Sequence, residues 1–320
     1  MIEEVQKVLE HFEAHSRNGF SFLTSFENRE FLLPTLVQLG YRTMDLWAAM
    51  GRANESTTLS CVPPRYRSEL VHAKNLTTLI TVISDDAADS SKDRGILEKV
   101  AGIVMAKLEN NPVVFDASDP HLMLVASSWD EVVSILESAP RFEEFRDLLL
   151  FDMGELMQCQ RFNLVINMNP LLCNTDEYLA YGTHNFNVKP HMTMDLMFSR
   201  DFRREDLAPF RRALHHIQTA IQLVNDVHTM DREIMDEGSF GNYSMIWGLE
   251  KGRISIDDVY QMRASKIRKA FPLRDFEKKW KRHMGMAREL LSRTNSFDVN
   301  DFLESVLAIR KMYEVASGRM

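Results

Sequence analysis

The chain has 320 residues, of which 45% are hydrophobic, so it can fill a sizeable core in one large domain or two. Its 13 glycines and 10 prolines exclude a fibrous repeat and a largely disordered chain. The net charge of −8 argues against a surface for nucleic acid or for an anionic membrane. An anionic substrate would therefore need positive charge supplied locally, by metal ions and a few Arg or Lys. We expect a single helical domain over residues 1–320.

The cysteines and the first residues of the chain indicate a compartment. Cys61, Cys159 and Cys173 show neither Cys-x-x-Cys spacing nor an even number, which fits a reducing cytosol. Acidic residues stand near the N-terminus where a secretory signal would carry basic ones, and no stretch reaches the roughly 18 apolar residues of a membrane span. These features predict a soluble, cytoplasmic protein that neither binds nucleic acid nor inserts stably into a membrane.

Apolar residues recur at helical spacing along most of the chain. They predict an amphipathic helix over 2–15 and a buried segment over 29–50. Two prolines at 63–64 break the chain, and a long buried helix then runs from near Tyr66 to an acidic cluster at 85–89. The further helices expected downstream lie at 96–108, 129–136, 142–158, 254–270, 274–293 and 302–315.

The acidic cluster at 85–89 reads Asp-Asp-Ala-Ala-Asp and lies where the long helix should end. Asp85 and Asp89 are four residues apart, so they share one helix face. The helix dipole is negative at a C-terminus, so carboxylates gathered there are unfavourable unless cations relieve the crowding. Taken alone, such a cluster could equally be a solvated helix end.

A second polar line follows a buried helical segment at 213–224. Asn225, Thr229 and Glu233 are spaced four apart, which places an amide oxygen, a hydroxyl and a carboxylate along one face. Asn and Thr are poor helix formers in a helix interior, so packing alone does not account for them. Mg²⁺ prefers such oxygen ligands and usually bridges them to substrate phosphates. Two rims of this kind facing each other predict a site that grips a diphosphate through metal ions.

The pair of motifs resembles the two signatures of class I terpene synthases. These are an aspartate-rich Asp-Asp-x-x-Asp motif and a downstream Asn-Asp-x-x-Ser/Thr-x-x-x-Glu motif, matched here at 85–89 and 225–233. The resemblance covers most of the chain. It implies an all-α, single-domain bundle of the class I terpenoid synthase type, and a lyase that ionises a prenyl diphosphate with Mg²⁺, held as three ions. The metal ligands that it implies are Asp85, Asp86, Asp89, Asn225, Thr229 and Glu233.

The resemblance also assigns groups to the substrate. Arg232 stands where the family usually has a basic residue that contacts diphosphate, and Asn242 lies in a short segment that resembles one following the second motif. Arg319, near the C-terminus, resembles the arginine of the family's final Arg-Tyr pair, although Met320 replaces the tyrosine. Arg232 and Arg319 would bind diphosphate oxygens through charge-assisted hydrogen bonds.

Aromatic and methionine side chains are candidates for the wall of the hydrocarbon pocket. Phe186, Phe198 and Trp247 could offer π faces to a carbocation, although each one taken alone fits an ordinary core. The methionines at 192–197 do not form one clean stripe and have the same two interpretations.

One departure from the family pattern concerns how ionisation is triggered. After a Glu-Tyr-Leu segment at 177–179, the family often has an arginine that senses diphosphate, and here Gly182 holds that place. His184 or Lys189 could supply the charge, or both could simply face solvent. Family members that act on a bicyclic C20 diphosphate can also lack this arginine, so the resemblance favours a geranylgeranyl or copalyl type of substrate and a diterpene hydrocarbon as product.

Three alternatives remain open from the sequence. The chain could be a sesquiterpene synthase that acts on farnesyl diphosphate. It could be a prenyl-chain elongating synthase, although that class would show two aspartate-rich motifs rather than an Asn and a Thr in the second. It could also be an inactive helical protein that only binds prenyl diphosphates. The sequence leaves open whether the chain forms a homodimer.

Overall fold

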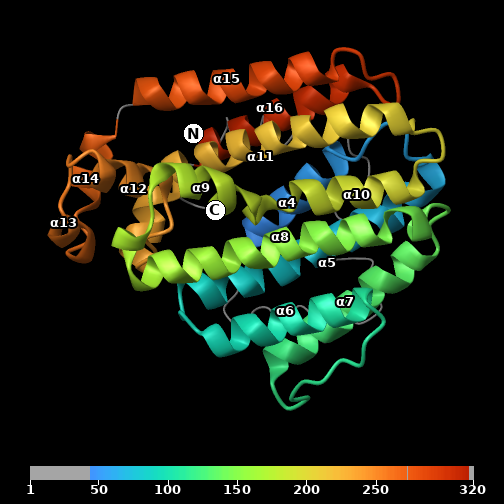
Figure 1. Cartoon of the computed structure of the whole chain (residues 1–320), viewed down its shortest axis with the longest axis horizontal. Helices are drawn as coiled ribbons and strands as arrows, with labels where there is room; N and C mark the ends of the chain where they lie inside the picture. Colours follow the sequence, from blue (N-terminus) through green and yellow to red (C-terminus); the bar gives the residue numbers. More distant parts are fainter. Residues whose placement is uncertain (1–43, 272, 317–320) are drawn as a thin grey trace.

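The computed structural model describes residues 44–271 and 273–316, and these form helices joined by short connections, with no strand in that part of the chain. The long helices lie side by side, and a cluster of short ones closes one end of the bundle (Figure 1). The expected all-α fold is therefore confirmed. The predicted helix at 2–15 and Arg319 lie outside the described residues.

The helices follow one another closely along the chain. Their bounds are α4 Met44–Ser56, α5 Pro64–Asp89, α6 Arg94–Leu108, α7 Pro120–Glu137, α8 Phe142–Met168, η1 Pro170–Leu172, α9 Thr175–Tyr181, η2 Gly182–Phe186, α10 Val188–Phe198, α11 Arg204–Arg232, η3 Glu233–Glu237, α12 Tyr243–Glu250, α13 Ile256–Tyr260, α14 Ala264–Ala270, α15 Leu273–Leu291 and α16 Val299–Ala316.

The core lies among α5, α8, α10 and α11, while α6 and α7 flank α5 and α15 covers α11 (Figure 1). Helix α5 begins at Pro64, in the first turn, where the missing amide hydrogen of proline costs no hydrogen bond. It ends with the acidic cluster, as the sequence predicts. Helix α11 ends beside that cluster, so the segments at 85–89 and 225–233 meet although they are far apart in the sequence.

Helix α5 buries an unusual number of polar side chains for a central helix. Its threonines satisfy their hydroxyl groups inside the helix, because each donates to the carbonyl one turn earlier. Thr77 donates to Ala73 at 2.9 Å, and Thr81 donates to Thr77 at 3.0 Å. These hydrogen bonds offset the free-energy cost of burying the threonine hydroxyls of α5 in the core. The hydroxyl oxygens of Thr78 and Thr81 lie on the helix face that leads to Asp85.

Three predicted helix boundaries are wrong. The helix expected over 142–158 is α8, which continues to Met168. The segment expected as one helix over 254–270 is two short helices, α13 and α14, because the chain turns between them at Met262, whose φ is +52°. Helix α7 begins at Pro120 rather than at 129, since the Asp119 side chain caps its first turn by accepting hydrogen bonds from the amides of His121 and Leu122. Among the described residues, no helix is long and apolar enough to cross a membrane.

Candidate active site

A cavity of about 140 Å³ opens where α5, η2 and α11 converge. Asp85 and Asp89 line it from α5, and Asn225, Arg232 and Glu233 line it from α11 and the turn that follows. The two acidic motifs of the sequence thus face the same cavity from opposite helices. This is the arrangement that a diphosphate held between two rims requires.

The rim on α11 is connected through the carboxylate of Glu233. The Thr229 hydroxyl donates to Glu233 Oε1, and the Asn225 amide lies 3.4 Å from the same oxygen. Asn242 donates to Glu233 Oε2 at 2.8 Å and also to the carbonyl of Asp226 at 2.8 Å. The side chains of Asn225, Thr229 and Glu233, which were predicted as one set of ligands, therefore lie together. Asn242 fixes the Glu233 carboxylate through its other oxygen.

The rim on α5 is held by amides from two other elements. Asn185, in η2, donates to Asp85 Oδ1 at 3.0 Å, and its own oxygen accepts from Gln160 at 2.5 Å. Asn167, on α8, donates to Asp89 Oδ1 at 2.7 Å. Asp86 does not line the cavity, and its carbonyl receives the amides of Ser90 and Ser91 that end the helix.

The neighbourhood of α11 gathers negative charge. Burial, together with the nearby charge of Glu233, raises the pKa of Asp226 well above its usual range. Tyr178 donates to both oxygens of Asp226, at 3.1 and 3.0 Å, and Gln222 donates to Oδ1 at 2.7 Å. Asp226 thus acts as a buried support for the turn that carries Glu233, and the excess of acids around the cavity favours cations.

The residues at the cavity fit Mg²⁺ in their chemistry. The two rims offer carboxylate and amide oxygens at the cavity, which are ligands that hard divalent cations prefer, and the Thr229 hydroxyl lies beside them on Glu233. Within residues 44–271 and 273–316, no three His, Cys, Asp or Glu side chains are grouped to hold a metal ion by themselves.

The aromatic candidates divide between the cavity and the core. Phe186 lines the cavity and meets Tyr313 edge to face, with ring centroids 6.5 Å apart. Phe198 is fully buried against Tyr66 and does not line the cavity. Trp247 packs edge to face on Phe271 in a separate part of the core. Of the three, the structure therefore places only Phe186 at the cavity.

Gly182 begins η2, directly after α9. A Cβ at this position would meet the ring of Tyr178 at 3.0 Å, so a larger residue would displace the side chain that supports Asp226. His184 and Lys189 both pair with Glu155, at 3.5 and 2.7 Å, and neither lines the cavity. Glu155 therefore gives both side chains a partner outside the cavity.

A second cavity of about 70 Å³ adjoins the first and is mostly apolar. Its wall comes from α10, α11 and α16, and includes Met192, Ile221 and Phe302. Five residues line both cavities, namely Met50, Asn54, Phe186, His191 and Tyr313. The acidic end of the site thus leads into an apolar end, as a substrate with a charged head and a hydrocarbon tail requires.

Sequence reasoning missed several polar residues of the cavity wall. They are Asn54, Thr78, Thr81, Asn163, Asn185, Asn187, His191 and Gln222. Only the threonines left a signal in the sequence, because Thr78 and Thr81 continue the helical face of Asp85 in a segment that is otherwise apolar. The others come from α4, α8, η2, α10, α11 and the residue between η2 and α10, which only the folded chain brings together.

Comparison with known proteins finds similarity in structure only. No family model matches the sequence, and no curated protein is significantly similar to it in sequence. The structure is similar to that of geranylgeranyl pyrophosphate synthetase from the archaeon Geoglobus acetivorans, with a TM-score of 0.58 and 11% identity over 98% of this chain and 96% of that one.

Two further solved structures that are similar to this chain contain metal and a substrate analogue. One is 2-methylisoborneol synthase from Streptomyces coelicolor A3(2), in complex with Mg²⁺ and 2-fluoroneryl diphosphate, with a TM-score of 0.58 and 13% identity over 99% of this chain and 92% of that one. The other is isoprene synthase from grey poplar, in complex with three Mg²⁺ ions and dimethylallyl-S-thiolodiphosphate, with a TM-score of 0.59 and 13% identity over 98% of this chain and 55% of that one. The chain therefore has the class I terpenoid synthase fold.

Proposed function

We propose that the protein is a Mg²⁺-dependent terpene synthase, which ionises a prenyl diphosphate and cyclises the resulting cation. One observation carries the proposal: oxygen-rich rims from α5 and α11 face a single cavity that continues into an apolar one. The solved structures with Mg²⁺ and diphosphate analogues support it through their shared fold.

Asp85 and Asp89 on one rim, and Asn225, Thr229 and Glu233 on the other, would hold the Mg²⁺ ions, which we expect to number three. Bound there, the metal would stabilise the negative charge that develops on the diphosphate as its bond to carbon breaks. Arg232 lies at the same cavity and would bind diphosphate oxygens through charge-assisted hydrogen bonds. Asn242 keeps Glu233 oriented and would act on substrate only through that carboxylate.

The apolar cavity would receive the hydrocarbon chain and control how it folds. Its aliphatic side chains offer the cation no nucleophile, and Phe186 and Tyr313 offer it aromatic faces. Closing this space to bulk water protects the cation from indiscriminate capture. In this proposal the polar cavity binds and releases the diphosphate, and the apolar cavity determines how the hydrocarbon chain folds before it cyclises.

We propose a C20 diphosphate of the geranylgeranyl or copalyl type as the preferred substrate, with a diterpene as product. The support is Gly182, which stands where an arginine sensor is common and is packed against Tyr178, so no arginine fits there without rearrangement. Asn185, which donates to Asp85, is the polar residue of η2 nearest to the acidic rim and the best candidate to replace that sensor.

The test is an incubation of purified protein with Mg²⁺ and, separately, geranylgeranyl, copalyl and farnesyl diphosphates. Products are read by gas chromatography with mass spectrometry, and released diphosphate is measured in parallel. We expect a C20 product; a C15 product would instead make the protein a sesquiterpene synthase. Longer prenyl diphosphates formed only when isopentenyl diphosphate is added would indicate an elongating synthase, and diphosphate release from none of the substrates would contradict the proposal.

A further inference from the structure

The junction between the two cavities carries polar groups that metal binding does not use. Of the five residues that line both cavities, Asn54 on α4 and His191 on α10 have side chains that can accept hydrogen bonds, and Tyr313 adds a hydroxyl. Asn54 is 7% exposed and His191 is 6% exposed. Buried polar atoms at such a place normally have partners, because leaving one without a partner costs free energy.

The orientation of the Asn54 amide is fixed by its neighbours. Its nitrogen donates to Asn75 Oδ1 at 2.9 Å and to Thr78 Oγ1 at 3.2 Å. Thr78 gives its only hydroxyl proton to the carbonyl of Lys74, at 2.9 Å, so it must accept from Asn54. The amide oxygen of Asn54 therefore remains available, and no side chain in the described ranges donates to it.

His191 presents a second acceptor. Its Nε2 atom has no hydrogen-bond partner among residues 44–271 and 273–316. Burial and the nearby Lys74 ammonium lower the pKa of His191 well below its usual value, while a hydrogen bond to the Lys74 backbone acts in the opposite direction. The ring is therefore neutral at physiological pH, and with its proton on the nitrogen that faces the Lys74 carbonyl, Nε2 keeps its lone pair.

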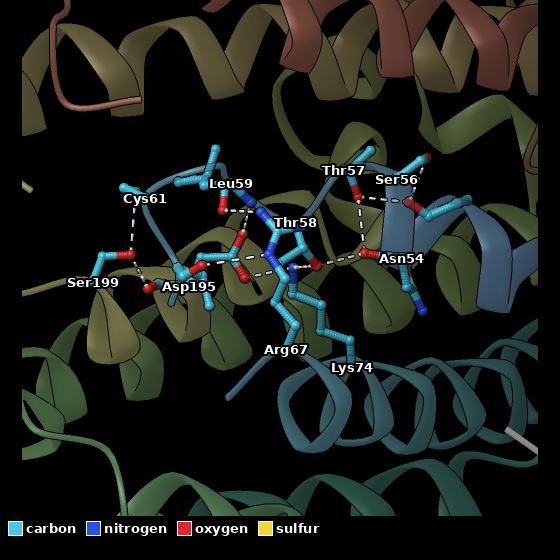
Figure 2. Close-up of polar contacts among 12 residues, drawn as sticks. Asn54, Ser56, Thr57, Thr58, Leu59, Cys61, Arg67, Lys74, Asp195 and Ser199 are labelled. Atoms are coloured by element: carbon cyan, nitrogen blue, oxygen red, sulfur yellow. Dashed lines mark hydrogen bonds and ion pairs between the residues drawn. The ribbon is translucent and has the colours of Figure 1, made fainter. Parts of the chain in front are cut away.

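A buried ion pair connects to the backbone of Asn54 through Thr58 (Figure 2). Lys74 Nζ lies 2.5 Å from Asp195 Oδ1, and both side chains are fully buried. Lys74 also donates at 2.9 Å to Thr58, whose hydroxyl donates to the carbonyl of Asn54 at 2.8 Å. Asp195 lies one turn after His191 on α10, so the network fixes α4, α5 and α10 to one another at the junction.

The chemistry of the two acceptors decides what can satisfy them. A hydrocarbon chain has no hydrogen-bond donor, and a diphosphate and its carboxylate surroundings are themselves acceptors. A water molecule has two donor protons and two lone pairs, and its share of liquid volume, about 30 Å³, is small beside a cavity of about 140 Å³. A water molecule at this junction can therefore donate to both acceptors.

We propose that Asn54 and His191 hold a water molecule that captures the final carbocation, so that the product is a terpene alcohol. The step follows from the proposed ionisation and rests on it. The water oxygen forms a new bond to the cationic carbon, one O–H bond breaks, and the proton passes to His191 Nε2. His191 becomes an imidazolium and returns the proton to solvent or to the released diphosphate. The capture needs only one bound water molecule, so it is compatible with a site that excludes bulk water.

The experiment is an incubation with Mg²⁺ and the prenyl diphosphate that the wild-type protein ionises, carried out in water enriched in oxygen-18. We expect a terpene alcohol that contains one heavy oxygen at its new carbon–oxygen bond. Among the products that each variant forms, His191→Phe and Asn54→Leu should lower the ratio of alcohol to hydrocarbon by roughly tenfold or more, whatever the total rate of diphosphate release. His191→Gln, which keeps an acceptor, should restore part of the alcohol.

A matched control is His283→Leu, which removes a half-buried histidine on α15 outside both cavities and should leave the product ratio unchanged. A wild-type product that is only hydrocarbon and carries no heavy oxygen would overturn the inference and leave the proposed synthase activity standing. An unchanged alcohol fraction in both His191→Phe and Asn54→Leu would overturn the assigned roles. Absence of diphosphate release from every substrate would instead reject the proposed function itself.

Discussion

Asp85 and Asn225 stand on opposite rims of the cavity, so each tests a different half of the proposed metal site. Replacing either Asp85 by Asn or Asn225 by Ala should lower diphosphate release by roughly 100-fold or more, since each change removes a metal-facing oxygen or its charge. The measurement is the rate of diphosphate release with saturating Mg²⁺, beside a thermal melt that reports folding.

Asp147→Asn is the control for these two variants, because it removes an exposed carboxylate from α8 whose one ion pair within the described part of the chain is with Arg146, at 3.5 Å. It should melt and turn over like the wild type. If Asp85→Asn and Asn225→Ala both kept full activity, the metal assignment at the two rims would be wrong.

The pair Lys74–Asp195 is fully buried, so breaking it leaves one charge without its partner. Burial lowers the pKa of Lys74 and raises that of Asp195, and each partner opposes the shift of the other. Asp195→Leu or Lys74→Met alone should lower the free energy of unfolding by about 3–5 kcal/mol, whereas the double variant should recover much of the loss. Urea unfolding of the four proteins measures this coupling, and additive losses would show that the pair is not coupled.

Helical periodicity predicted which polar side chains share a helix face, namely Asp85 with Asp89 and Asn225 with Thr229 and Glu233. Their role as metal ligands stays a prediction. Periodicity could not identify Asn54 or His191 as cavity residues, because the position of each depends on how α4 and α10 pack across α5.

At the scale of single elements, the turn at Gly182 joins the end of α9 to η2 and carries Asn185 toward Asp85. Gly182→Ala should lower the free energy of unfolding by about 1–3 kcal/mol, because the new methyl group would meet the Tyr178 ring at 3.0 Å. Since Tyr178 supports Asp226, activity should fall as well. Thermal melts and diphosphate release measure the two effects.

Gly102→Ala is a suitable comparison for Gly182→Ala, because the structure has nothing within 4 Å of a Cβ at that position in α6. It should keep or slightly raise stability, since alanine favours a helix over glycine. Equal stability of the two variants would show that the contact with Tyr178 is not restrictive.

The sequence predicted the long helices and not their interruptions. Apolar spacing predicts α5, α6 and α15 closely, because a helix that buries one face needs apolar residues at helical spacing. The turn at Met262 and the early start of α7 depend instead on a single left-handed residue and a single capping side chain, which periodicity does not encode.

For the whole molecule, α5 and α11 run toward the same end of the bundle (Figure 1), and residues near the end of each line the cavity. A ligand that binds both rims should therefore stabilise the entire fold. Mg²⁺ with inorganic diphosphate, at about 100 times its dissociation constant, should add about 2.7 kcal/mol to the free energy of unfolding. Thermal melts measure the effect, and a chelator or Asp85→Asn should remove it. An identical melt with and without both ligands would count against a shared site.

The all-α fold could be predicted from the sequence, because apolar residues recur at helical spacing along most of the chain. The resemblance of the two motifs to those of class I terpene synthases indicated the same helical bundle. The choice of substrate could not, since the volume and lining of the cavities come from side chains of many helices. Similarity to solved structures at 11–13% identity supports the fold and leaves that choice to experiment.

The most direct test of the central claim is the release of diphosphate from geranylgeranyl, copalyl and farnesyl diphosphates by the wild-type protein, measured with Mg²⁺ and with a chelator. A synthase built on the two rims predicts release that requires Mg²⁺ and is accompanied by a terpene product. Equal release in the presence of the chelator, or none from any of the three substrates with Mg²⁺, would contradict it.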